Sequence, residues 1–354
     1  MQPAIIPKNY CSRCPNWREN ALFHDSEVIL EAKHIIKQFP APGKKVLTAC
    51  NDISLNICKG KTLGIVGESG CGKSTLVRML IQMDEPTSGE ILYHGRDIVH
   101  LTEKEKWLNR QHMQMIFQDP LASFHPKMKV VDILTEPLMN FGRLSKNNRE
   151  AKAKELLRMV ELPEDFLYRY PHSMSGGQRQ RIGIAKALSL EPEILICDEA
   201  TSALDVSIQK TIIELLVKIQ KEKNIGIVFI CHDIALVKSL SHQVAVMYLG
   251  HIVEVVPGDQ LSSQGTHPYT KALLGALFSV HMNQKERIQC IGGEVPSPLD
   301  IPKGCPFQNR CLYCGEICRI QKPVLKVIGE GHKVACHMVG ADKNDESRRE
   351  AFPS

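Results

Sequence analysis

The chain has 354 residues, of which 43% are hydrophobic and 23% charged, a composition typical of a soluble globular protein. Its formal net charge of +5 is too small to indicate nucleic-acid binding, although it is compatible with work at an anionic membrane surface. No apolar run approaches the roughly 20 residues of a membrane-spanning helix, and the N-terminus has no apolar core of signal-peptide type. We therefore expect a cytosolic chain that would meet a membrane only peripherally, through partners.

Taken in chain order, the sequence first gives a predicted extension over residues 1–27 and then an alternation of strands and helices. Short apolar runs predict strands, some of them fully buried, at residues 28–35, 52–57, 62–67, 113–120, 194–199 and 227–233, and the segment 85–95 predicts a turn followed by a strand. Amphipathic stretches predict helices at residues 74–83, 148–162 and 207–224. Strands that alternate with helices favour an α/β domain with a largely parallel sheet.

The clearest local signal is the glycine-rich loop between the strand at 62–67 and the helix at 74–83. It matches the pattern G-x-x-x-x-G-K-[ST] in the strand–loop–helix setting that phosphate binding requires. Backbone N–H groups of such a loop wrap phosphate oxygens, and the helix N-terminus adds partial positive charge. Lys73 is expected to reach the β- and γ-phosphates. The sequence therefore predicts an ATP site made by Gly67, Ser69, Gly70, Cys71, Gly72, Lys73, Ser74 and Thr75.

A pair of carboxylates, Asp198 and Glu199, follows the buried run at 194–197. In nucleotide-binding α/β folds, ligands sit at the carboxyl ends of strands. We expect Asp198 to act on Mg²⁺, through water, together with the Ser74 hydroxyl, and Glu199 to polarise the attacking water as a general base. Alone, such a pair would usually be a solvated helix start. The phosphate-binding loop makes the catalytic interpretation preferable.

A second glycine motif consists of Ser175, Gly176, Gly177 and Gln178, followed by a predicted helix. Serine is a good N-cap and the glycines permit close backbone approach, so the motif predicts a second anion site at a helix N-terminus. One ATP has a single γ-phosphate, and the first loop already covers one side of it. Two such devices in one chain therefore suggest that two chains sandwich each nucleotide.

In order and spacing these motifs resemble the ATP-binding cassette (ABC) family. The run SMSGGQRQR resembles its signature motif, and LICDEATSALD resembles its Walker B motif and D-loop. Gln118 in MIFQDP resembles the Q-loop, and His232 in FICHD the switch histidine. The resemblance covers about residues 28–262. It implies a P-loop NTPase fold of the α/β class, with a RecA-like core, an antiparallel β subdomain and a helical subdomain at about residues 119–185.

The resemblance also implies roles for single residues. Gln118 would sense Mg²⁺ and water and connect to a membrane subunit, His232 would contact the γ-phosphate, and Asp205 would couple two sites across a dimer. Phe39 would stack on adenine, because aromatic faces bind bases well; its alternative is a plain strand residue. The catalytic set is then Lys73, Gln118, Glu199 and His232, and the Mg²⁺ set is Ser74, Gln118 and Asp198.

The implied mechanism is the ATP-driven closure of two subunits head to tail, with each signature serine and glycine on the partner's ATP. Hydrolysis and phosphate release would reopen the dimer, and the different ATP affinities of the two states would drive the membrane partner. Two positions depart from the family pattern: Met174 stands where Leu or Phe is common, and Ala200 where Pro is common. Neither departure removes a catalytic atom.

After about residue 262 the chain becomes rich in Pro, Gly and Cys, and we expect a separate C-terminal region at 263–337 and a disordered tail at 338–354. The segments at 267–274 and 292–318 resemble the C-terminal region of ATPase subunits from dipeptide and oligopeptide importers, and YPHSMSGGQRQR with SALDVSIQ resembles their F-type subunit. This implies a sister ATPase, two permease subunits and an external solute-binding protein, with the chain on the cytoplasmic face of the cell membrane.

The C-terminal region carries four cysteines whose order matches the cysteine pattern of this importer family: Cys305, Cys311, Cys318 and Cys336. Four thiolates suit a [4Fe-4S] cluster or Zn²⁺, and spacing alone leaves the two even. The resemblance favours the cluster; unligated cysteines are the third alternative. We assign no role to Cys314, and we favour free thiols for the isolated pair Cys11 and Cys14.

The leading hypothesis is an energy-coupling ATPase of a peptide importer. The same role for another solute, such as nickel or haem, is the nearest alternative, because nothing in this chain contacts the solute. A soluble ABC ATPase that acts on ribosomes or DNA is disfavoured by the single phosphate-binding loop and single signature. A regulatory iron–sulfur protein with a degenerate ATP site is disfavoured by the intact Lys73, Asp198, Glu199 and His232.

Overall fold

The computed structural model describes residues 27–201, 204–278 and 296–339. All of the predicted N-terminal extension except Glu27, the pair Cys11 and Cys14, and almost all of the predicted tail at 338–354 lie outside these ranges. Within them, no helix combines the length and the apolar character that a membrane span needs.

The N-terminal part forms an antiparallel sheet, the small sheet, which has four strands within the described residues in the order β2-β1-β4-β5. Its strands are β1 (Val28–Ala41), β2 (Lys45–Cys58), β4 (Ser88–Tyr93) and β5 (Arg96–Asp97). The two first strands run longer than the segments 28–35 and 52–57 predicted for them. They form a hairpin that continues through several register shifts to its tip, where Ala41 pairs with Lys45. Alternation is lost at those shifts, so the sequence pattern showed only the inner half of each strand.

The centre of the molecule is the large sheet, with strand order β11-β12-β10-β9-β3-β8-β7-β6 among the described residues. Strands β9, β3, β8, β7 and β6 run parallel, and the remaining pairs are antiparallel. The bounds are β3 (Thr62–Val66), β6 (Met113–Ile116), β7 (Ile194–Asp198), β8 (Gly226–Ile230), β9 (Gln243–Tyr248), β10 (His251–Pro257), β11 (Lys326–Gly329) and β12 (His332–Val334). The central parallel strands β3, β7 and β8 are nearly continuous apolar runs because helices and the small sheet bury them on both faces.

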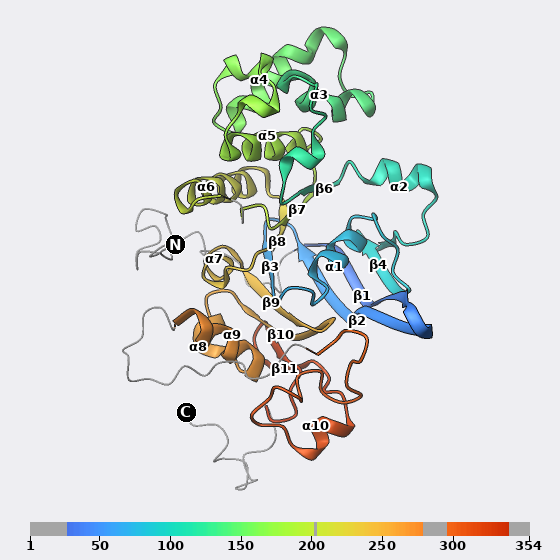
Figure 1. Cartoon of the computed structure of the whole chain (residues 1–354). Coiled ribbons are helices and arrows are strands. Elements are labelled where there is room, and N and C mark those ends of the chain that lie inside the picture. The colour runs from blue at the N-terminus through green and yellow to red at the C-terminus, as the bar shows by residue number, and fades with distance from the viewer. Residues whose placement is uncertain (1–26, 202–203, 279–295, 340–354) are drawn as a thin grey trace.

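Helices surround the large sheet and form a separate layer above it in the view of Figure 1. That layer holds α3 (Val130–Asn140), α4 (Arg149–Met159) and α5 (Gly176–Leu188). The remaining helices are α1 (Lys73–Leu80), α2 (Glu103–Asn109), α6 (Val206–Lys223), α7 (Ile234–Leu240), α8 (Leu261–Gln264), α9 (Pro268–Phe278) and α10 (Glu316–Ile320). Short 3-10 turns are η2 (Pro42–Lys44), η3 (Pro120–Ser123), η4 (Lys146–Asn148), η5 (Glu164–Tyr168) and η6 (Pro171–Ser173). The predicted α/β core with antiparallel and helical subdomains is confirmed.

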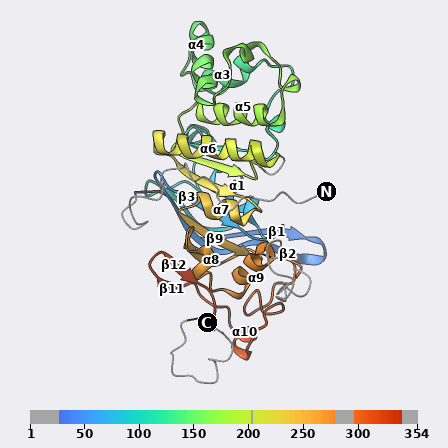
Figure 2. The ribbon, with the colours of Figure 1, turned by 90° about the vertical axis from the view of Figure 1, so that its left-hand side faces the viewer.

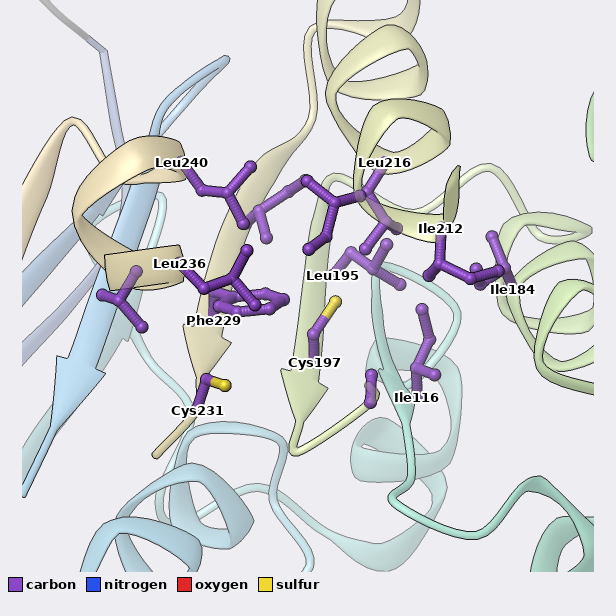
Figure 3. Packing of buried hydrophobic residues seen from close by; sticks show 14 of the residues in the cluster. Ile116, Ile184, Leu195, Cys197, Ile212, Leu216, Phe229, Cys231, Leu236 and Leu240 are labelled. Carbon is purple, nitrogen blue, oxygen red and sulfur yellow. The ribbon is translucent and has the colours of Figure 1, made fainter. Parts of the chain in front are cut away.

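The main core lies between the parallel strands and the helices that cover them. Figure 3 shows Leu195 of β7 and Phe229 of β8 pointing toward Leu216 of α6 and Leu240 of α7. The same buried cluster reaches through Ile184 of α5 into the helical layer. One hydrophobic core therefore joins the sheet to the helical subdomain.

The C-terminal region continues this core rather than hanging from it. Strand β12 pairs antiparallel with β10, and the Ala335 N–H donates to the Val253 carbonyl oxygen at 2.8 Å. Figures 1 and 2 both place this region against the β9–β10 end of the large sheet. Tyr269, Cys305 and Phe307 belong to the main buried cluster. The region predicted at 263–337 thus shares a sheet and a core with the cassette. The sequence does not reveal this link, because β12 has only three residues and gives no strand pattern.

Candidate functional site

The glycine-rich loop runs from the end of β3 into α1, as predicted. Gly72 caps α1 with φ +105°, a backbone conformation that residues with a side chain rarely adopt. A Cβ on Gly72 would lie 2.1 Å from the carbonyl oxygen of Ala49, so the loop passes against β2 with no room for a side chain. Ser69, Gly70 and Ser74 are exposed on this loop, whereas Cys71 and Lys73 are buried. The loop therefore presents backbone and small polar groups to solvent.

The Lys73 ammonium lies inside the loop. Its Nζ donates to the carbonyl oxygens of Gly67 and Glu68, at 2.8 Å each, and lies 3.7 Å from the Cys71 sulfur. Burial raises the pKa of the Cys71 thiol, which keeps it neutral beside the cation. Carbonyl oxygens are neutral partners, and phosphate oxygens would form stronger, charge-assisted bonds with the same ammonium.

Asp198, the last residue of β7, lies beside the start of α1. Burial raises the pKa of its carboxyl, and a hydrogen bond from the Ser74 side chain acts in the opposite direction. Its Oδ1 is buried and has no hydrogen-bond partner among the described residues. A buried carboxylate oxygen without a partner is costly unless something binds it. Hard cations such as Mg²⁺ prefer oxygen ligands, so the paired Ser74 and Asp198 oxygens fit the predicted Mg²⁺ site.

Glu199 and His232 contact each other, a link that the sequence analysis did not predict. The Glu199 Oε1 lies 2.5 Å from the His232 Nε2, with His232 half-exposed and Glu199 largely covered. Glu199 adopts φ +49°, and its N–H donates to the Ile230 carbonyl oxygen at 3.0 Å. Strained backbone of this kind is frequent at functional sites. Adjacency of β7 and β8 in a parallel sheet, whose strands end at one edge, could have predicted this contact.

Gln118 and Phe39 occupy two different sheets. Gln118 is exposed just after the end of β6. Because β6 pairs in parallel with β7, Gln118 and Asp198 lie at the same edge of the large sheet. Phe39 lies near the hairpin tip of β1, paired with Leu47, and its ring is partly exposed under the Lys37 ammonium at 5.0 Å. An exposed ring suits base stacking, but the adenine contact stays a prediction.

The signature segment begins helix α5 with reciprocal capping. The Ser175 Oγ accepts from the Gln178 N–H at 3.3 Å, and the Gln178 side chain accepts from the Ser175 N–H at 2.9 Å. The pattern S-x-x-Q could have predicted the second bond, which the sequence analysis missed. Gly177 packs against α6, where its Cβ would lie 2.5 Å from Ile208. Ser175 itself is exposed, so its hydroxyl stands at an open helix N-terminus.

Asp205 caps helix α6. Its carboxylate accepts from the Ile208 N–H at 3.0 Å and from the Ser207 hydroxyl at 2.6 Å, and these bonds, that to Ser207 first, hold its pKa below the usual range. The preceding D-loop residues Ser202 and Ala203 lie outside the described part of the chain. The structure thus gives Asp205 a role in its own helix, and its coupling role stays a prediction.

The four C-terminal cysteines lie in one neighbourhood. Burial raises the pKa of the Cys305 thiol to about 12 and that of Cys311 to about 11, and the charges of Cys318 and Cys336 contribute to both shifts. The Cys305 N–H donates to the Cys318 carbonyl oxygen at 2.7 Å. Within the described residues, however, no three His, Cys, Asp or Glu side chains are arranged to hold a metal ion. The structure therefore supports their proximity and gives no support to a formed metal site.

Two family models match the chain: "ABC transporter" over residues 50–202, and "Oligopeptide/dipeptide transporter, C-terminal region" over residues 253–318. The oligopeptide transport ATP-binding protein AppF of Bacillus subtilis is 44% identical over 324 residues, covering 89% of this chain and 98% of AppF. The oligopeptide transport ATP-binding protein OppF of Salmonella typhimurium is 42% identical over 331 residues, covering 90% of this chain and 98% of OppF.

Solved structures agree with these matches. The dimeric ABC transporter cassette MJ0796 superposes with a TM-score of 0.59 at 29% identity, covering 64% of this chain and 98% of that chain. A second structure of MJ0796 is a post-hydrolysis state bound to ADP and Pi, with the same TM-score and identity. The chain therefore belongs to the ATP-binding proteins of the ABC transporter family, and it carries the C-terminal region of the oligopeptide and dipeptide transporters.

Proposed function

We propose that this chain hydrolyses ATP to energise a membrane importer of oligopeptides or dipeptides. The observation that carries the proposal is the meeting, at one edge of the large sheet, of the Glu199–His232 pair with the Ser74–Asp198 pair beside Lys73. The names of the relatives, which are oligopeptide and di/tripeptide transport ATP-binding proteins, support peptides as the solute.

Each group has a step that its position favours. Lys73 leaves its carbonyl partners to bind the β- and γ-phosphates, and loop N–H groups hold the remaining oxygens. Ser74 and Asp198, with Gln118 as predicted from the resemblance, would hold Mg²⁺, which would supply positive charge to the phosphates. Glu199 takes the proton of the attacking water. His232, which already contacts Glu199, orients the Glu199 carboxylate and binds the γ-phosphate.

The proposed working form is a dimer of two cassettes. The exposed Ser175 with Gly176, Gly177 and Gln178 would close on the nucleotide of a partner chain, and Asp205 would lie at the interface between the two sites. For an importer of this branch, the partner would be a sister ATPase, joined to two permease subunits and supplied by an external solute-binding protein. The chain would then sit peripherally on the cytoplasmic side of the membrane, with its cassette at about residues 28–262 and its importer-type region at about 263–337.

The test is ATP hydrolysis by the reconstituted complex with the exchange Glu199→Gln. This variant keeps the side-chain volume and removes the base. We expect nucleotide binding close to that of the wild type and a loss of turnover of about 10²–10⁴-fold. Steady hydrolysis by the variant would disprove the general-base role. Peptide-stimulated hydrolysis with the cognate solute-binding protein, and no stimulation by nickel or haem, would support peptides as the solute.

We also propose that Cys305, Cys311, Cys318 and Cys336 bind a [4Fe-4S] cluster, with Zn²⁺ as the alternative. Four neighbouring thiols are a suitable donor set. In the described residues, however, the thiols are not arranged as a metal site. Metal analysis and absorption spectra of anaerobically purified chain test this. Iron and sulfide near four atoms each per chain support the cluster; absence of both iron and zinc would disprove the site.

A further inference from the structure

Glu68, the second residue of the phosphate-binding loop, is held from three sides. Its carbonyl oxygen accepts from Lys73 Nζ at 2.8 Å, and its N–H donates to the hydroxyl oxygen of Tyr269 at 2.9 Å. Its carboxylate is bound by Arg310, with Nη1–Oε2 at 2.7 Å and Nη2–Oε1 at 3.0 Å. Two of these three partners come from the C-terminal region, more than 200 residues away along the chain.

The Arg310–Glu68 pair is a two-point, largely buried ion pair. The Arg310 side chain is only 5% exposed and that of Glu68 23%. The two parallel N–H···O bonds fix both distance and orientation, which a single contact to a lysine would not do. Removal of the guanidinium would leave the carboxylate partly buried and unpaired, which is strongly unfavourable.

A cluster of three aromatic side chains, one of them Tyr269, packs beside Arg310. The rings of Tyr248, Tyr269 and Phe307 lie 4.6–5.4 Å from one another, and the guanidinium of Arg310 lies 5.8 Å from the Tyr248 ring centre and 6.0 Å from that of Phe307. Tyr248 ends β9 in the large sheet, whereas Phe307 belongs to the cysteine-rich loop. The same packing therefore contacts both Arg310 and Tyr269, the two C-terminal partners of Glu68.

We propose that the C-terminal region positions the phosphate-binding loop through Arg310 and Tyr269, so that the affinity of the chain for ATP depends on these two residues. The ion pair has a second effect, since it neutralises a carboxylate that belongs to the loop that must receive the negatively charged phosphates. Arg310 and Tyr269 are positioning residues, because both act on ATP through Glu68.

The experiment measures binding of a fluorescent, non-hydrolysable ATP analogue to the full-length chain, together with KM and kcat for ATP in the assembled complex. We expect Arg310→Met to weaken analogue binding by about 10-fold or more, because it unpairs a partly buried charge. Tyr269→Phe keeps the ring and removes one hydrogen bond, so we expect a loss of about 3- to 10-fold. In the complex KM should rise while kcat at saturating ATP stays near the wild-type value.

Three variants separate positioning from a general loss of stability. Arg310→Lys keeps the charge and should recover part of the affinity. Glu68→Gln combined with Arg310→Met removes the unpaired carboxylate, so the double variant should bind better than Arg310→Met alone. Arg319→Met changes an exposed arginine of the same region and should leave the affinity unchanged. Thermal unfolding without nucleotide identifies any variant that fails to fold. If Arg310→Met does not fold, the analogue affinities of the two single variants Tyr269→Phe and Arg310→Lys test the proposal instead.

Unchanged analogue affinity in folded Arg310→Met and Tyr269→Phe would overturn the proposal while leaving the ATP site intact. Equal effects of Arg310→Met and Arg319→Met would overturn it too. If the wild-type chain failed to bind the analogue, the ATP site itself would be wrong, and the proposal would fall with it.

Discussion

The exchange Gly72→Ala tests how closely the phosphate-binding loop passes its neighbours. An alanine here would adopt φ +105°, which costs about 1–2 kcal/mol. Its Cβ would also lie 2.1 Å from the Ala49 carbonyl oxygen and 2.8 Å from the Met247 side chain, so the loop or β2 must move. Overpacking of this kind costs a further 1–3 kcal/mol or so. We expect a total loss of about 2–5 kcal/mol in the free energy of unfolding.

Gly70→Ala is the matched control for this prediction. Gly70 also has positive φ, at +76°, but a Cβ there would meet no described atom within 4 Å. Only the backbone cost remains, about 1–2 kcal/mol. Urea unfolding of the two variants measures the difference, and the fluorescent ATP analogue shows whether the loop of Gly72→Ala still binds. Equal losses of stability in both variants would refute the argument from the close approach.

Three further predictions concern the capping serine, a buried histidine and the metal pair. Ser175→Ala should lower the unfolding free energy by about 1 kcal/mol through the lost cap. The same variant should slow hydrolysis by the assembled dimer and leave analogue binding by the isolated chain unchanged. Weaker binding by the isolated chain would contradict a contact between Ser175 and the partner's nucleotide. Burial lowers the pKa of His251 to about 3, below the value of about 6.5 in an unfolded chain, so its contribution to stability is complete above pH 6.5 and is lost as the pH falls toward 3. Between pH 7 and 5.5 urea unfolding should show about 1 kcal/mol less loss of stability for His251→Gln than for the wild type, and parallel pH curves would show that the histidine is not responsible. Asp198→Asn removes the charge beside Ser74, so ATP with Mg²⁺ should stabilise the variant against heat no more than ATP with EDTA does; a retained Mg²⁺ effect would place the ion elsewhere.

Local motifs made the ATP site and the α/β core predictable. The loop Gly67–Thr75 and the carboxylates after β7 follow from residue types at fixed spacing, and continuous apolar runs such as β7 and β8 identify buried parallel strands. Each of these signals lies within a short segment of the chain, and its chemistry allows few other residue types. The sheet edge at which β7 and β8 end then follows from topology.

Contacts between distant segments were not predictable in the same way. The ion pair of Arg310 with Glu68 joins residues 242 positions apart, and neither residue carries a pattern that points to the other. The hairpin β1–β2 was underestimated because its register shifts interrupt alternation. The cysteines show a third limit: their order indicates a family, but a ligand set depends on side-chain arrangement, which spacing alone does not determine.

The pairing of β12 with β10 has a practical consequence for anyone who divides this protein. Strand β10 (His251–Pro257) is buried along most of its length, and the C-terminal strands complete its outer side. A chain cut after residue 262 would expose the N–H and C=O groups of β10 at the margin of an apolar sheet, a surface that recruits other strands. The shortened protein should therefore self-associate, and the ATPase region is best produced together with the C-terminal strands.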